Sequence, residues 1–135
     1  MNHLIKKNGL IAAGVINILG ALGSSQFFTN TVINETDPIV MSNFGLLMIV
    51  VWGMAYIGAS TIDGNIKWLA LVFALEKLAY VGAWLFWLSS NELGPVFAKD
   101  ASAGIFFATY GVNDFVFMVF FFWLFVSERA EAPFK

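Results

Sequence analysis

The feature that most constrains the fold is a series of four long apolar segments, Leu10–Phe28, Ile39–Ala59, Ile66–Leu88 and Ala103–Val126. Each is close to the length of about 20 residues with which a helix crosses a hydrocarbon core of about 30 Å. With 59% hydrophobic residues, the chain is also more apolar than a soluble domain of its size. Strands of a membrane barrel alternate apolar and polar residues over about ten positions, and these segments do not. We therefore predict an all-α polytopic membrane protein, a bundle of four transmembrane helices.

The breaks between the segments are short and rich in turn-forming residues. They are Asn34–Pro38, Asp63–Asn65 and Ser89–Pro95. No linker is long enough to separate two domains, and the sequence has neither a repeat of solenoid period nor a low-complexity stretch. We therefore predict one domain over residues 1–135.

Lysine and arginine indicate the orientation of the bundle, because they accumulate in short cytoplasmic loops. Threading four helices through a membrane places only Lys99 on one side. The other side receives the other positive residues outside the membrane segments, Lys6, Lys7, Lys67, Arg129 and Lys135. We therefore predict that both termini are cytoplasmic and that the protein is a multi-pass protein of the bacterial inner membrane.

The first segment has a second interpretation, as a signal peptide. Lys6 and Lys7 precede an apolar stretch, and Ala21–Gly23 offers a cleavage site. Cleavage would leave three helices with a balance of positive charge that no longer fits the orientation rule. We therefore favour four helices.

The composition argues against several classes of function. Only 12% of the residues are charged and the net charge is −2 without a basic block, whereas nucleic-acid binding needs clustered lysine or arginine. No Walker motif or dinucleotide-binding glycine motif occurs. The chain has no cysteine, and its one histidine, His3, lies outside the apolar segments. A single chain therefore cannot hold a bis-histidine haem or a thiolate metal site. We assign no metal ligand, and the sequence leaves any cofactor unknown.

Three charged residues interrupt the apolar segments at depth. Glu76 and Lys77 are adjacent in the third segment, and Asp114 lies in the fourth. At about 1.5 Å per residue, Lys77 lies some 17 Å and Asp114 some 18 Å from the same membrane face. A charge at the centre of a membrane helix costs on the order of 2.5–3.5 kcal/mol, so each needs a partner, water or a change of protonation. Because a short connection makes the two segments antiparallel neighbours, we predict that Lys77 faces Asp114 while Glu76 is protonated or hydrogen-bonded.

Aromatic and polar residues follow these charges at helical spacing. Tyr80 and Trp84 lie one and two turns beyond Glu76. The fourth segment has a similar stripe, and the second has an aromatic pair four residues apart. The candidate ligand-binding residues are Asn17, Trp52, Tyr56, Glu76, Lys77, Tyr80, Trp84, Tyr110, Asn113 and Asp114. No catalytic residue and no metal ligand is assigned.

A purely structural role is the alternative for several of these residues, because buried polar side chains often fix the pairing of helices in a bundle. Asn17 lies among Ala13, Gly20 and Ser24, a face of small residues that predicts the close approach of another helix. Asn113 is open to the same interpretation. Isolated charges inside a membrane, by contrast, are usually functional.

The chain resembles small bacterial membrane proteins of the DoxX-like and BphX-like groups. Its length near 135 residues and its four short-looped helices are similar, and the motif-like pieces are Ala74–Lys77 (ALEK) and Gly111–Asp114 (GVND). Members of these groups are accessory membrane proteins, some associated with quinone-linked oxidation or aromatic degradation. The resemblance therefore implies a helper role in the inner membrane, and it carries over no catalytic residue. Small multidrug transporters are less similar, since their essential carboxylate lies in the first helix, where this chain has Asn17.

Three functions are consistent with these features. The first is binding or carriage of a small apolar or amphipathic ligand, with aromatic residues around it and the charges at its polar end. The second is a non-catalytic accessory or assembly subunit of a larger membrane complex. The third and least favoured is an intramembrane enzyme with Glu76 or Asp114 as acid or base, because no nucleophile–base pair or metal set accompanies them. The expected partners are the lipid bilayer, the ligand, and a second copy of the chain or a larger complex.

Overall fold

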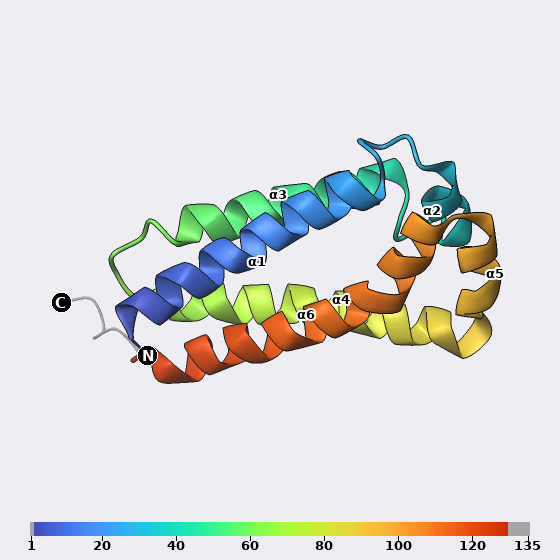
Figure 1. Ribbon diagram of the computed structural model, residues 1–135. Helices are drawn as coiled ribbons and strands as arrows, with labels where there is room; N and C mark the ends of the chain where they lie inside the picture. Colours follow the sequence, from blue (N-terminus) through green and yellow to red (C-terminus); the bar gives the residue numbers. More distant parts are fainter. Residues whose placement is uncertain (1, 130–135) are drawn as a thin grey trace.

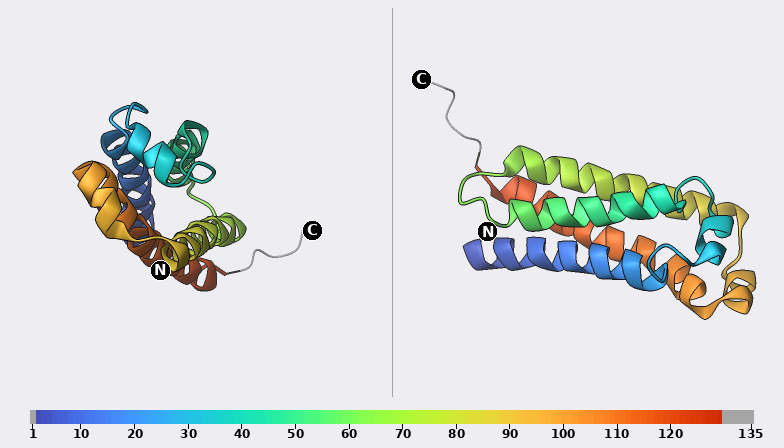
Figure 2. Two further views of the ribbon diagram at one scale, coloured as in Figure 1. Left: turned by 90° about the vertical axis from the view of Figure 1, so that its right-hand side faces the viewer. Right: turned by 90° about the horizontal axis from the view of Figure 1, so that it is seen from above.

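The computed structural model describes residues 2–129, whose regular structure is entirely α-helical. Four long helices form two antiparallel pairs, seen from the side in Figure 1 and from two further directions in Figure 2. In one pair α1 (His3–Ser24) packs on α3 (Asn43–Ala59), and in the other α4 (Lys67–Ser90) packs on α6 (Ala101–Ser127). Contacts between α1 and α6 join the pairs. The short helices α2 (Thr31–Thr36) and α5 (Leu93–Lys99) contact each other at one end of the bundle.

The predicted all-α fold is confirmed, and three of the four expected spans are helices of sufficient length. By length and composition, α1, α4 and α6 are each able to cross a membrane. The helix α3 is apolar but has 17 residues, which makes it about 25 Å long. Large apolar side chains cover the outside of the long helices, among them Leu19, Phe44, Met54, Trp68, Leu75, Phe86, Phe115 and Phe122. Such a continuous apolar exterior is typical of a protein that is surrounded by lipid.

The first helix differs from its predicted bounds at both ends. It begins at His3, because the Asn2 side chain accepts a hydrogen bond from the Leu4 N–H and caps the helix. It ends at Ser24 rather than Phe28, since the next residues form a turn with left-handed φ angles of 51°, 56° and 67° at residues 26–28. The buried Ser25 hydroxyl accepts a hydrogen bond from the Phe28 N–H within this turn.

The connections at the α2 and α5 end contain more helix than the turn residues predict. The end of α2 includes Asn34–Thr36, because Asn30 caps this helix by accepting a hydrogen bond from a backbone N–H. The start of α5 includes Leu93–Pro95, where proline is tolerated because N–H groups of a first helical turn need no partner within the helix. Both short helices run across the end of the bundle rather than along it (Figure 1).

Both ends of the described chain lie at the opposite end of the bundle, which we call the basic end (Figure 1). It also includes the connection between α3 and α4, and it carries Lys6, Lys7, Lys67 and Arg129. The Lys6 ammonium is 2.8 Å from Glu128 Oε1 and donates a hydrogen bond of 3.1 Å to the Gly64 carbonyl. The end closed by α2 and α5 is called the capped end, and Lys99 lies there. Lys135 is outside the described residues.

The close approach of α1 and α3 occurs at two glycines. A Cβ atom on Gly14 would lie 2.5 Å from the Gly53 carbonyl oxygen, and one on Gly53 would lie 2.7 Å from the Gly14 oxygen. Ala13 is fully buried beside this contact. A Cβ on Gly20, however, would meet no atom within 4 Å. The predicted close approach of a helix to the small-residue face of α1 therefore occurs at its Ala13 and Asn17 end, where a Cβ on Gly53 would lie 3.0 Å from Asn17 Cβ, and not at Gly20.

Candidate functional site

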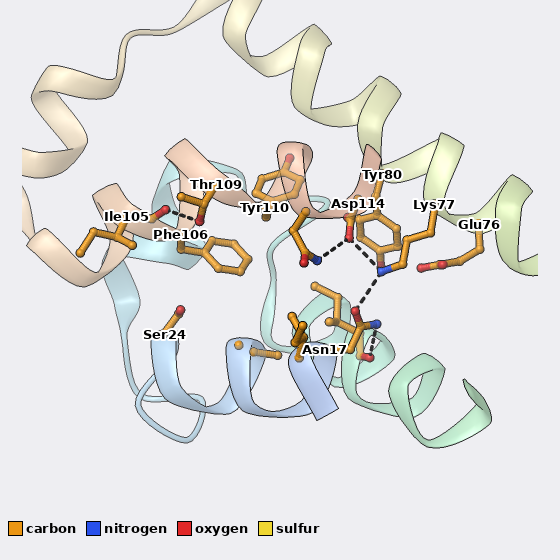
Figure 3. A pocket seen from close by; sticks show the side chains of 15 residues that line it. Asn17, Ser24, Glu76, Lys77, Tyr80, Ile105, Phe106, Thr109, Tyr110 and Asp114 are labelled. Atoms are coloured by element: carbon orange, nitrogen blue, oxygen red, sulfur yellow. Dashed lines mark hydrogen bonds and ion pairs between the residues drawn. The ribbon is translucent and has the colours of Figure 1, made fainter. Parts of the chain in front are cut away.

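Lys77, near the middle of α4, lies at the centre of a polar network. Figure 3 shows its contacts. The residue is 1% exposed. Its ammonium is 2.8 Å from Asp114 Oδ1 on α6, and it donates a hydrogen bond of 2.9 Å to Asn17 Oδ1 on α1. It also lies 5.3 Å from the centroid of the Tyr56 ring on α3. The predicted pairing of Lys77 with Asp114 is confirmed.

Two amide groups complete the network around this ion pair. Asn17 Nδ2 donates a hydrogen bond of 3.1 Å to the Ile49 carbonyl of α3, and Asn113 Nδ2 donates one of 3.3 Å to Asp114 Oδ1. A buried ion pair needs such added hydrogen bonds to offset the loss of water around both charges. The network therefore links all four long helices at one depth.

Glu76 uses a different partner from its neighbour Lys77. The Tyr56 hydroxyl on α3 donates a hydrogen bond to Glu76 Oε2. Tyr56 is fully buried, with its ring 4.8 Å from the Phe73 ring and 4.9 Å from the Phe121 ring, measured between centroids. Of the two states expected for Glu76, the structure contains the hydrogen-bonded one. The two adjacent charges, about 100° apart around α4, thus form hydrogen bonds with different residues, and both lie beside Tyr56.

A pocket of about 110 Å³ adjoins the network. It extends from the charged side chains toward the capped end, between Ser24 at the end of α1 and Ile105 near the start of α6 (Figure 3). The structure brings seven of the ten predicted ligand-binding residues into its wall, namely Asn17, Glu76, Lys77, Tyr80, Tyr110, Asn113 and Asp114. The charges lie at one end of the pocket and mostly apolar side chains at the other.

The other three predicted residues do not line this pocket. Tyr56 reaches the network only through Glu76 and Lys77. Trp84 Nε1 donates a hydrogen bond of 2.7 Å to the Phe107 carbonyl, and its ring fills the space beside Gly111. Trp52 packs edge-on against Phe73, with ring centroids 6.2 Å apart. Trp52 and Trp84 therefore pack within the bundle, away from the charged end of the pocket.

Eight further residues line the pocket without having been predicted. They are Ile16, Gly20, Ala21, Ser24, Ile49, Ile105, Phe106 and Thr109. Most are apolar or small, and similar residues occur throughout the membrane segments, so no local signal marks them. Gly20 is the exception. It has no side chain and no neighbour within 4 Å of where a Cβ would lie, so it leaves space for the pocket.

One polar atom of the wall has no partner. The Tyr110 hydroxyl is buried and forms no hydrogen bond with the described residues. Within residues 2–129, no group of three or more histidine, aspartate or glutamate side chains is arranged to hold a metal ion. The chemistry offered by the site is therefore that of carboxyl, ammonium, amide and phenol groups around a small space.

Comparison with known proteins found no family model, curated protein or solved structure that matches this chain. The resemblance to the DoxX-like and BphX-like groups therefore stays a prediction. A functional proposal for this chain rests on the geometry of the site.

Proposed function

We propose that this chain is a multi-pass membrane protein that binds or carries a small apolar or amphipathic ligand beside Glu76, Lys77 and Asp114. The observation that carries the proposal is the pocket next to these three residues, with polar groups gathered at one end of an otherwise apolar wall. Ligand sites commonly combine an apolar lining with a few convergent polar groups that orient the ligand. Charged residues at this depth of a membrane helix are also usually functional.

The volume of the pocket limits what it holds. About 110 Å³ is less than the roughly 300–1,000 Å³ of sites that enclose a whole drug-sized molecule. It corresponds to the space of roughly three or four water molecules. The pocket therefore suits the head group of an amphipathic molecule or a very small apolar one, and a longer apolar part would extend out of it.

The proposal includes a topology of four membrane spans with the basic end in the cytoplasm of a bacterial cell. The apolar residues Ile39–Met41 before α3 and Ile62 after it lengthen the apolar stretch of this shorter helix. Four positive side chains at the basic end support a cytoplasmic location for both termini.

Reporter fusions test this topology. Fusions after residue 135 and at Asp63–Gly64 should report the cytoplasm, and fusions at Glu35 and Glu92 should report the periplasm. A periplasmic carboxyl terminus would rule out the four-span arrangement.

Filling the pocket tests ligand binding. Gly20→Leu adds a side chain to the pocket wall at a position where a Cβ meets no atom within 4 Å, so the new side chain can start there without a clash and should reduce the space of the pocket. Gly82→Leu is the matched control, because Gly82 is also helical, exposed and unobstructed but does not line the pocket. Both changes raise helix propensity by a similar amount.

Mass spectrometry of extracts from the purified proteins supplies the measurement. We expect a small molecule in near-equal molar amount with the wild type and Gly82→Leu, and its loss from Gly20→Leu. The same molecule retained in all three proteins, or found in none of them, would contradict the proposal.

The alternative is an accessory or assembly subunit of a larger membrane complex, and one observation favours it. Lys77 and Asn17 both donate hydrogen bonds to groups of the chain itself, as in a network that only pairs helices. This alternative predicts that a larger membrane protein co-purifies with the wild type and equally with Gly20→Leu. A homo-oligomer that keeps its bound small molecule would instead support the ligand-binding proposal.

A further inference from the structure

We infer that the pocket selects amphipathic amines, which have one cationic head group that donates hydrogen bonds and one apolar chain, and that it takes them up from the lipid between α1 and α6. The inference rests on the proposed function and adds the chemical class of the ligand. Its first basis is the set of hydrogen-bonding groups in the wall that remain unused.

Each nitrogen-bearing side chain of the wall already donates to a group of the chain itself. Lys77 donates to Asp114 and Asn17, and its ammonium lies against the Tyr56 ring. Asn17 Nδ2 donates to the Ile49 carbonyl. The orientation of the Asn17 amide is fixed by these two contacts, because its oxygen must face the ammonium and its nitrogen the carbonyl. An anionic ligand would add a further negative charge beside the Glu76 and Asp114 carboxyls.

Two carboxyl oxygens of the wall remain free. Glu76 accepts the Tyr56 hydrogen bond through Oε2, and Asp114 accepts those of Lys77 and Asn113 through Oδ1. Glu76 Oε1 and Asp114 Oδ2 accept no hydrogen bond from the described residues, and neither is among the fully enclosed unpartnered atoms. An ionised carboxylate oxygen only accepts hydrogen bonds. A ligand group that hydrogen-bonds to these two oxygens must therefore be a donor.

The charge balance favours a cationic donor over a neutral one. The wall contains two carboxyl groups, Glu76 and Asp114, and one ammonium, Lys77. With both carboxyls ionised the site carries one unbalanced negative charge, which is costly away from water. An ammonium head group supplies the missing positive charge together with its hydrogen-bond donors. The unpartnered Tyr110 hydroxyl is compatible with this ligand, since a phenol both donates and accepts.

The opening of the pocket explains why the ligand also needs an apolar chain. Ile16 on α1 is 44% exposed and Ile105 on α6 is 57% exposed, so the pocket reaches the outer surface between these helices. The two helices touch near the basic end, where Phe120 covers Gly9. Toward the capped end the Thr109 hydroxyl at the rim is satisfied by the Ile105 carbonyl at 2.7 Å, which leaves an apolar rim. In the proposed topology this rim faces lipid tails.

Three probes with the same chain and different heads test the inference on the full-length protein in phosphatidylcholine nanodiscs. Decylamine is a cationic donor at pH 7, 1-decanol is a neutral donor and acceptor, and decanoate is an anion. Equilibrium dialysis of labelled probe measures binding, and Gly20→Leu provides the background from partition into lipid. We expect saturable binding of decylamine to the wild type and Gly82→Leu, with affinity about tenfold or more above that of 1-decanol and decanoate, because a hydrogen bond to a charged group contributes more than a neutral one.

A change at Glu76 tests the role of the unbalanced carboxyl. Glu76→Gln keeps the shape of the side chain and an oxygen that accepts the Tyr56 hydrogen bond, but it removes the extra negative charge. Decylamine affinity should fall about tenfold, while 1-decanol binding should not change. An unchanged preference for decylamine in this variant would overturn the assignment of Glu76.

The outcomes separate this inference from the proposed function. Saturable binding of 1-decanol or decanoate as tight as that of decylamine, lost in Gly20→Leu, would overturn the amine preference and leave the proposed ligand site standing. Absence of saturable, Gly20→Leu-sensitive binding for every probe would overturn both. The probe comparison uses the unmodified protein, so it decides the preference even if Glu76→Gln does not fold.

Discussion

Two lysine–carboxylate pairs of nearly the same geometry lie in very different parts of the bundle. Lys6 and Glu128 meet at the basic end with an N–O distance of 2.8 Å, and Lys77 and Asp114 meet halfway along it at the same distance. Protein covers both pairs to a large extent, with side chains 10% and 16% exposed in the first and 1% and 10% in the second. Neither distance nor coverage by protein therefore separates them.

The difference lies in what surrounds the covered groups. Lys6 lies beside the polar connection between α3 and α4 and also donates to the Gly64 carbonyl, so water at the helix ends can replace a lost partner. Around Lys77 the proposed topology leaves protein groups, the small pocket and lipid, and no bulk water. We therefore expect the depth of an ion pair in this bundle to decide its contribution to stability more than its geometry does.

Breaking the central pair should have the largest effect. Lys77→Leu leaves Asp114 without its cation, and Asp114→Leu leaves a buried ammonium with only one hydrogen-bond partner. Each single change should lower the free energy of unfolding by about 3–5 kcal/mol, since removing one partner leaves an uncompensated buried charge. Denaturant unfolding in a detergent that preserves the fold measures this loss.

The double change Lys77→Leu with Asp114→Leu provides the control for this prediction. Replacing both charges with apolar groups removes the desolvation cost, so the double variant should be more stable than either single variant. It should also lose ligand binding if the site is functional. Additive losses in the double variant would show that the two charges do not interact energetically and would break the comparison.

The amide of Asn17 should have an intermediate effect. Asn17→Leu removes one acceptor from the Lys77 ammonium and leaves the Ile49 carbonyl without its donor. The expected loss is about 1–3 kcal/mol, the cost of leaving a buried polar group unsatisfied. The same unfolding measurement applies, and a loss as large as that of Lys77→Leu would mean that Asn17, not Asp114, is the main partner of the ammonium.

The pair at the basic end should contribute least among these contacts. Lys6→Ala and Glu128→Ala should each cost about 0.2–1 kcal/mol, and the coupling between them should decrease at high salt. A double-mutant cycle at low and high ionic strength measures both quantities. A coupling energy at the basic end as large as that of the central pair would show that depth is not the deciding variable.

The central pair could be predicted from the sequence because it depends on only two simple quantities. Counting residues gives the depth of Lys77 and Asp114, and the short connection between their helices makes them neighbours. The helix ends were harder to predict, since Phe27 and Phe28 continue the apolar pattern although their φ angles are left-handed. Hydropathy reports the environment of a residue but does not report its backbone conformation.

The pocket itself could be predicted only in part. Its polar wall follows from the charged stripe. Its apolar wall depends on the space that α1 and α6 leave between their contact at Gly9 and Phe120 and their hydrogen bond at Ser24 and Ser102, which is a property of the tertiary packing. Tyr80 and Trp84 illustrate the limit. They share one stripe of α4, and Tyr80 lines the pocket. Trp84 lies one turn further on, where Gly111 of α6 leaves room for its ring, so Trp84 packs against α6 instead.

A carboxylate at the capped end extends the comparison to a charge outside the long spans. Asp100 Oδ2 accepts hydrogen bonds of 2.8 Å from Asn30 Nδ2 and from the Ala103 N–H. Through the second of these, Asp100 caps the start of α6. These two hydrogen bonds, that from Asn30 foremost, hold the pKa of the Asp100 carboxyl below its ordinary value. The charged form is therefore the one that the folded protein stabilises.

The acid dependence of stability should show this small contribution. Because the pKa of Asp100 is lowered in the folded protein, the unfolded chain binds the proton first as the pH falls. The contribution is complete above the ordinary aspartate pKa of about 3.9 and is lost as the pH falls through the lower folded value. Asn is also a good helix cap, so Asp100→Asn removes mainly the charge, and the thermal midpoint of the wild type should exceed that of this variant near neutral pH. The difference between the two thermal midpoints should decrease as the pH is lowered. Other carboxyls titrate alike in both proteins and so do not affect this difference. A difference that is constant with pH would show that Asp100 acts only as a neutral cap.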